Sequence, residues 1–198
     1  MIAVKHGTVA TVSDPHEIAN VLGLEGIRYM IDNGDKVPLK FYFGAPSCVP
    51  ATDLETNGAT LGPDKIEELF MEDDCRFLGE MMNYPGVINE EEDVMEKIKV
   101  SKNYDRPIDG HAPGLTGEDL DKYVSAGIST DHECISLEEA EEKIEKRMKI
   151  QIREGSLSKK LEDFFPLLEK YPDRCMLCSD DRHPDDLIRG HIDLIVKK

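Results

Sequence analysis

The chain has 198 residues, 39% of them hydrophobic, and its 41 Asp and Glu outnumber its 24 Lys and Arg to give a formal net charge of −17. Such a charge repels phosphate backbones and anionic membrane surfaces, so we expect no nucleic acid and no membrane as partner, and favour a small molecule, a metal ion or another protein. The length and hydrophobic content favour a folded domain with its own core over disorder.

Short β-like segments alternate with amphipathic helical patterns along the whole chain. In the most regular helical pattern, Leu137, Ala140 and Ile144 recur every three or four residues after a capping Ser136. In chain order, the predicted strands are Thr8–Ser13, Leu39–Phe43, Arg76–Gly79, Pro107–Asp109, Gly127–Thr130, Lys149–Ile152 and Cys175–Cys178. The helices predicted between them are Pro63–Phe70, Glu90–Lys99, Gly117–Ala126, Ser136–Arg147 and Ser156–Lys170.

This alternation predicts an α/β fold with a parallel sheet, either doubly wound or closed as a (β/α) barrel. Polar residues that follow the predicted strands decide between the two. They are Asp14, Glu80, His111, His132, Arg153, Glu154 and Asp180. A barrel gathers all its strand ends around one pocket, whereas an open sheet uses mainly its switch point, so we predict a TIM (β/α)8-type barrel.

The predicted barrel is incomplete. A full barrel takes about 250 residues, whereas we count seven strands in a sequence that begins directly in one of them. We therefore expect residues 1–198 to form a single barrel domain whose first strand is missing. The faces of the Ser136–Arg147 helix that carry Glu139 and Glu142 should lie outside this barrel.

Four metal-binding residue types stand at strand ends, namely Glu80, His111, His132 and Asp180. Each follows a different strand, so the barrel should bring their side chains into one pocket. Imidazole nitrogens and carboxylate oxygens together suit Zn, Mn or Fe. A carboxylate can also bridge two ions.

Several motifs are spread along the chain, namely Asp14–Val21, Pro46–Thr52, Gly79–Val87, Asp109–Gly114, Asp131–Glu133 and Asp180–Asp186. Through them the chain closely resembles the adenine deaminases of the amidohydrolase superfamily. The resemblance covers nearly the whole chain. It implies hydrolytic deamination of adenine to hypoxanthine and ammonia by a metal-bound hydroxide, in a barrel of the metal-dependent hydrolase kind.

The resemblance also implies a role for each candidate residue. In a two-metal centre of Mn or Fe, with Zn possible, Glu80 would bridge the ions and His111 and His132 would ligate one of them. Asp180 would ligate the other ion and carry the proton in catalysis. The residues expected to contact the purine base are Asp181, Glu133 and His16.

One feature of the family is missing. The first barrel strand in this family carries a His-x-His pair that completes the metal centre, and this sequence contains no such pair. We therefore expect the chain to bind at most one divalent ion tightly, or to bind metal weakly. We also expect it to lack the parts that flank the barrel. Three interpretations remain: an adenine deaminase, a catalytically incomplete remnant or split-enzyme subunit that needs a complementing chain, and an amidohydrolase acting on another substrate. A homo-oligomer is a further alternative for the assembly.

Cysteine usage and the start of the chain predict a cytoplasmic protein. No stretch approaches the roughly 18 apolar residues of a membrane helix, and residues 1–6 have no signal-peptide character. The five scattered cysteines are expected to be reduced. They include Cys175 and Cys178, whose three-residue spacing on a strand directs them to opposite faces.

The two remaining histidines near the end of the chain are expected to have structural roles. His183 should begin a helix and His191 should lie within it.

Overall fold

The computed structural model describes residues 2–52 and 54–198. Across these residues, seven strands alternate with helices, and every strand pairing is parallel. The strands are β1 (Ala10–Ser13), β2 (Lys40–Ala45), β3 (Phe77–Met81), β4 (Ile108–Gly110), β5 (Thr130–Asp131), β6 (Lys149–Arg153) and β7 (Cys175–Cys178).

The helices connect and flank these strands. In the first half of the chain they are η1 (Ala3–His6), α1 (His16–Leu22), α2 (Leu24–Gly34), α3 (Pro63–Met71), α4 (Tyr84–Ile88) and α5 (Glu92–Asn103). In the second half they are α6 (Gly117–Ser125), α7 (Leu137–Glu145), α8 (Leu161–Lys170), η2 (Pro172–Arg174), α9 (Pro184–Arg189) and α10 (Ile192–Lys197). No helix among the residues described is long and apolar enough to cross a membrane.

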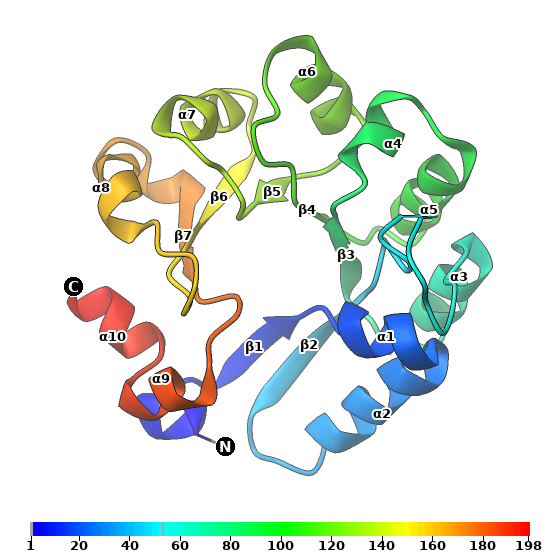
Figure 1. The fold of residues 1–198 in the computed structure, drawn as a ribbon, viewed down its shortest axis with the longest axis horizontal. Helices are drawn as coiled ribbons and strands as arrows, with labels where there is room; N and C mark the ends of the chain where they lie inside the picture. Colours follow the sequence, from blue (N-terminus) through cyan, green and yellow to red (C-terminus); the bar gives the residue numbers. More distant parts are fainter. Residues whose placement is uncertain (1, 53) are drawn as a thin grey trace.

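The sheet curls into most of a barrel. Strands pair in the order β1-β2-β3-β4 and β5-β6-β7, and a parallel bridge between Ile108 and Ile128 joins the two groups. Figure 1 shows the strands following one another around the centre with α1 to α8 outside them, while η1, α9 and α10 lie between β7 and β1. The prediction of an incomplete TIM-type barrel is therefore confirmed.

Apolar side chains explain how the helices attach to the strands. One buried cluster joins β2, β3 and β4 to their helices and includes Ile66, Leu78 and Met81. A second cluster, which includes Ile152 and Phe164, joins β6 to α7 and α8. Burial of each cluster holds the strand ends, and hence the residues that follow them, in fixed positions.

Among the helix predictions, two differ from the structure in ways that change the contacts of nearby residues. The helix expected from residue 156 begins at Leu161, because the Glu154 carboxylate accepts a hydrogen bond from the Leu161 N–H and the preceding residues form a turn. His191 lies between α9 and α10 rather than inside one helix, and its ring nitrogens bond the hydroxyls of Thr8 and Ser179. These contacts tie the end of the chain to its beginning.

Candidate metal centre

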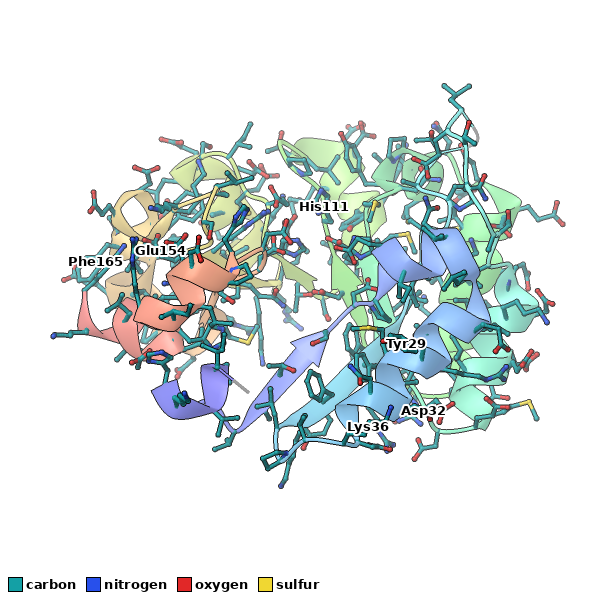
Figure 2. All side chains as sticks on the ribbon, turned by 60° about the horizontal axis from the view of Figure 1, so that its bottom comes forward. Tyr29, Asp32, Lys36, His111, Glu154 and Phe165 are labelled. Carbon is teal, nitrogen blue, oxygen red and sulfur yellow. The ribbon has the colours of Figure 1, made fainter. Side chains whose placement is uncertain are left out.

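The predicted metal ligands lie at one end of the barrel. Glu80 is the next-to-last residue of β3, His111 directly follows β4 and His132 directly follows β5. Because the strands are parallel, these positions share one rim. In Figure 2, His111 lies at the upper side of the molecule and Lys36, which precedes β2, at the lower side.

Glu80, His111 and His132 converge on one point. The Glu80 Oε2 atom lies 2.8 Å from His111 Nδ1 and 3.0 Å from His132 Nε2, and the two ring nitrogens are 3.4 Å apart. All three side chains are largely buried. Two imidazole nitrogens and one carboxylate oxygen at these separations form a ligand set that fits a divalent ion. We call these three residues the first triad.

The electrostatics of the first triad favour a cation. Burial raises the pKa of the Glu80 carboxyl, but hydrogen bonds with His111 and His132 outweigh it and hold that pKa well below its usual range. Burial also disfavours a charge on His132, yet Glu80 raises the pKa of the His132 imidazole. Glu80 is therefore held ionised, which is the state in which a carboxylate binds a metal ion.

The other carboxylate oxygen of Glu80 faces a different pair of residues. Glu80 Oε1 lies 3.4 Å from Nδ1 of His16, and that nitrogen lies 3.7 Å from Asp14 Oδ1. Burial raises the pKa of Asp14. Burial disfavours the His16 imidazolium, but the neighbouring Asp14 carboxylate raises the pKa of His16 to about 9.

Asp180 borders the first triad without joining it. Its Oδ2 atom lies 4.0 Å from His132 Nε2 and 2.7 Å from the Nε atom of Arg153. Arg153, the last residue of β6, also pairs with Glu133 and lies 3.8 Å from the Asp181 carboxylate. The guanidinium thus gathers three acidic side chains next to His132. Its position after a predicted strand was the only sequence signal of this arrangement.

A buried charge cluster supports the loops that carry the two histidines. The Lys143 ammonium is fully buried and donates hydrogen bonds to Asp131 Oδ2 at 2.8 Å, Glu139 Oε1 at 2.5 Å and the Ala112 carbonyl at 2.6 Å. Asp131 directly precedes His132, and Ala112 follows His111. The cluster therefore fixes the backbone on both sides of the first triad.

The same cluster overturns one prediction. Glu139 was expected on the outer face of its helix, but its side chain is buried. Its two oxygens accept hydrogen bonds from the backbone N–H groups of Gly114 and Ile135 as well as from Lys143. A carboxylate with this many donors loses little by leaving water.

A comparison with known proteins now places the chain. The amidohydrolase family model matches residues 1–193. The chain belongs to the amidohydrolase family. This family is metal-dependent, in agreement with the ligand set at the barrel rim.

Three curated relatives carry the name adenine deaminase. This chain is 59% identical to the adenine deaminase of Salinibacter ruber over 99% of its length, and 58% identical to that of Sulfurovum sp. over 100% of its length. The adenine deaminase of Methanosarcina mazei is 57% identical over the same span. The chain spans about 36% of the length of these relatives.

Solved structures agree on the fold. The chain matches 3-keto-L-gulonate-6-phosphate decarboxylase from Vibrio cholerae with a TM-score of 0.59 and 13% identity, covering 98% of this chain and 88% of that one. It matches a TatD homologue from Escherichia coli with a TM-score of 0.57 and 14% identity, covering 95% of this chain and 78% of that one. At these identities the likeness concerns the fold alone.

Proposed function

We propose that residues 1–198 form one catalytic barrel domain of an adenine deaminase. The observation that carries this proposal is the first triad, Glu80, His111 and His132, converging at the carboxyl ends of successive strands in a chain 59% identical to a named adenine deaminase. In the proposed reaction the oxygen of water adds to the purine carbon that bears the amino group, and the carbon–nitrogen bond breaks. The products are hypoxanthine and ammonia.

The first triad would hold a divalent ion of Mn or Fe, with Zn also suited to the donor set. When bound, such an ion acts as a Lewis acid and lowers the pKa of its bound water toward neutral pH. Glu80 and the two imidazoles would hold the ion at the rim. The buried Lys143 cluster keeps their loops in place, as outer-shell partners of metal ligands do.

Asp180 is proposed to move the proton. It lies beside His132 at the rim, and its Oδ2 atom lies 2.7 Å from the Nε atom of Arg153. A carboxylate so placed can accept a proton from water and deliver it to the departing amino nitrogen, which must leave as neutral ammonia. We propose that Asp180 would also ligate the other metal ion of the centre.

For contact with the base we propose Glu133 and Asp181. Asp181 is 69% exposed and lies 3.8 Å from Arg153. Glu133 also pairs with Arg153 and offers a carboxylate oxygen within 4.8 Å of a His132 ring nitrogen. Carboxylates there can accept hydrogen bonds from purine N–H groups. We also propose His16 as a residue that contacts the base; its buried Nδ1 atom lies 3.4 Å from Glu80 Oε1.

A complementing chain remains the second proposal, because the sheet offers two edges. In the described part of the chain, β1 and β7 each pair with one neighbouring strand, and Val12 on β1 is 71% exposed. Unpaired strand edges are templates for an added strand.

The free state of all five cysteines supports a reducing compartment, so we propose the cytoplasm as the location.

The test is release of ammonia from adenine by the Mn²⁺-loaded chain, with adenosine and a cyclic amide as competing substrates. The assay is run with the chain alone and with the remaining part of the Salinibacter ruber relative added in trans. Turnover of adenine that is lost in His132→Asn and kept in His183→Asn supports the proposal. Turnover of the cyclic amide alone, or no turnover in either arm, contradicts it.

A further inference from the structure

The pairing of β3 with β4 shifts register in the stretch that contains Glu80. Between the paired positions, β3 advances from Leu78 to Met81 while β4 advances only from Ile108 to Gly110. One extra residue on β3 is the pattern of a β-bulge, which disrupts the hydrogen-bond ladder locally and can re-aim a side chain. The backbone groups around Glu80 therefore need partners other than the neighbouring strand, because buried N–H and C=O groups are costly to leave unpaired.

The N–H group of Glu80 is paired by Asp14, the residue that follows β1. Asp14 Oδ2 accepts a hydrogen bond from this N–H at 3.0 Å. A Cβ atom at Gly79 would overlap the same oxygen, so only glycine permits this close approach. The carboxylate of Asp14 therefore holds the Glu80 backbone from the side of β1.

The carbonyl of Glu80 is paired by a buried hydroxyl. Ser47 Oγ donates a hydrogen bond to this carbonyl at 2.6 Å, and Ser47 is buried. Ser47 lies after β2, within the motif Pro46–Thr52. In the same motif, Cys48 Sγ accepts a hydrogen bond from the Asn83 N–H at 3.4 Å. The loop after β2 thus holds the backbone from Glu80 to Asn83.

A second buried hydroxyl joins the ends of β3 and β4. The Tyr123 hydroxyl, from α6, donates a hydrogen bond to the Met81 carbonyl at 2.8 Å and accepts one from the His111 N–H at 3.0 Å. Because Met81 directly follows Glu80, this single oxygen lies between the backbones that carry two of the ligands. Tyr123 is fully buried in the cluster that joins β2, β3 and β4 to their helices. A close-packed core fixes such a ring, so its hydroxyl sets the separation of the two strand ends.

We propose that two buried hydroxyls, those of Ser47 and Tyr123, position the backbone of the first triad for binding a divalent ion. Both hydroxyls donate to backbone carbonyls, and their role is to place the ligands rather than to contact the ion. Ligands of a metal site must be held to within about 0.5 Å. Without either hydroxyl the bulge would relax, and Glu80 would move relative to His111. The proposal deepens the proposed function and rests on it only for the metal ion.

The test measures the Mn²⁺ dissociation constant of the full 198-residue chain by equilibrium dialysis in Tyr123→Phe and Ser47→Ala. Each change removes a hydroxyl and keeps the rest of the side chain. The affinity for Mn²⁺ should fall by about 10–100-fold in each variant, the usual effect of losing an outer-shell partner of a metal ligand. The visible absorption bands of the Co²⁺-loaded chain provide a second readout, because they follow the coordination geometry of the ion. These bands should differ from those of the wild type in both variants.

The matched control is Ser101→Ala. Ser101, on α5, is fully buried, and its hydroxyl donates a hydrogen bond to the Arg106 carbonyl at 2.9 Å. Arg106 precedes β4 whereas His111 follows it, so this bond lies at the opposite end of the strand. All three variants should have a lower melting temperature without metal, since each leaves a buried backbone group without its partner. Only Ser101→Ala should keep the Mn²⁺ affinity and the Co²⁺ bands of the wild type.

The outcomes decide between a positioning role and a merely structural one. Wild-type Mn²⁺ affinity and Co²⁺ bands in either folded variant overturn the proposal, as does an equal loss of affinity in Ser101→Ala or a wild type that does not bind Mn²⁺. Weaker binding and altered bands confined to Tyr123→Phe and Ser47→Ala support it. If circular dichroism shows that one of the two fails to fold, the other decides.

Adenine assays on the same samples keep the proposed function separate. A wild type that binds Mn²⁺ but does not deaminate adenine rejects the proposed function alone. The positioning role is then still decided by the dissociation constants and the Co²⁺ bands, neither of which requires turnover.

Discussion

Replacing Lys143 by methionine tests whether the buried charge cluster holds the metal centre together. Methionine preserves the length and most of the volume of the side chain but removes the ammonium. Asp131 and Glu139 would then lose their common cation, and the Ala112 carbonyl would lose its hydrogen-bond donor. The backbone next to His111 and His132 would lose a common anchor.

The expected cost is large because the partners cannot reach water. Lys143 and Asp131 are fully buried, and Glu139 is almost so. Removal of one partner from a buried ion pair typically destabilises a protein by about 3–5 kcal/mol. For a protein of this size, about 2–4 °C per kcal/mol gives a fall in melting temperature of roughly 6–20 °C.

The pH dependence follows from the direction of the Lys143 shift. Burial lowers the pKa of Lys143, but the charge of Asp131 and its hydrogen bonds to the two carboxylates raise it above the usual 10.5. A raised pKa in the folded state means that the stabilisation is complete below the pKa of the unfolded chain and is lost as pH rises through the folded value. The difference between wild type and Lys143→Met should therefore stay constant from neutral to mildly alkaline pH.

Urea unfolding followed by circular dichroism measures this effect, with Lys146→Met as the control. Lys146 caps the end of α7, the helix that carries Lys143, and pairs with the exposed Asp121. Removing its ammonium should therefore change the free energy of unfolding little. Mn²⁺ affinity of the first triad in folded Lys143→Met should fall by about 10–100-fold. The reasoning is refuted if the two variants have the same free energy of unfolding.

Three further outcomes are expected. Asp180→Asn should lower adenine turnover by about 10²–10⁴-fold, the usual contribution of general acid–base catalysis. The control His183→Asn should keep most activity. The reverse pattern, or loss only in Asp181→Asn, would show that the proton carrier is assigned wrongly. Gly79→Ala should displace Asp14 and destabilise the fold by about 1–3 kcal/mol, measured by urea unfolding; an unchanged midpoint would contradict the close approach. Removal of metal by a chelator should end turnover, and Mn²⁺ returned at 100 times its dissociation constant should stabilise the chain by about 2.7 kcal/mol; a melting temperature that does not respond to Mn²⁺ would argue against a structured site.

Local sequence patterns were sufficient to predict the first triad. Glu80 lies near the end of a recognisable strand, and His111 and His132 each directly follow one. Parallel strands in a barrel must present their carboxyl ends at one rim. The prediction needed no knowledge of distances. Asp180 obeys the same rule, but its Oδ2 atom lies beside Arg153. The sequence could not show which of its neighbours this side chain would face.

The parts that could not be predicted depend on contacts between distant segments. Glu139 and Lys143 are four residues apart in an acidic helix, a pattern typical of a solvent-exposed pair, and only the fold brings Asp131 against them and makes the cluster buried. Asp14 likewise looks like a polar residue after a strand until Gly79, on β3, lets it reach the backbone of Glu80. In both cases an acidic residue at the end of a strand is held by a distant segment: Asp131 by Lys143, and Asp14 by the backbone of Glu80. The residues that position a metal centre are therefore harder to read from a sequence than its ligands, because their role is defined by a neighbour far away in the chain.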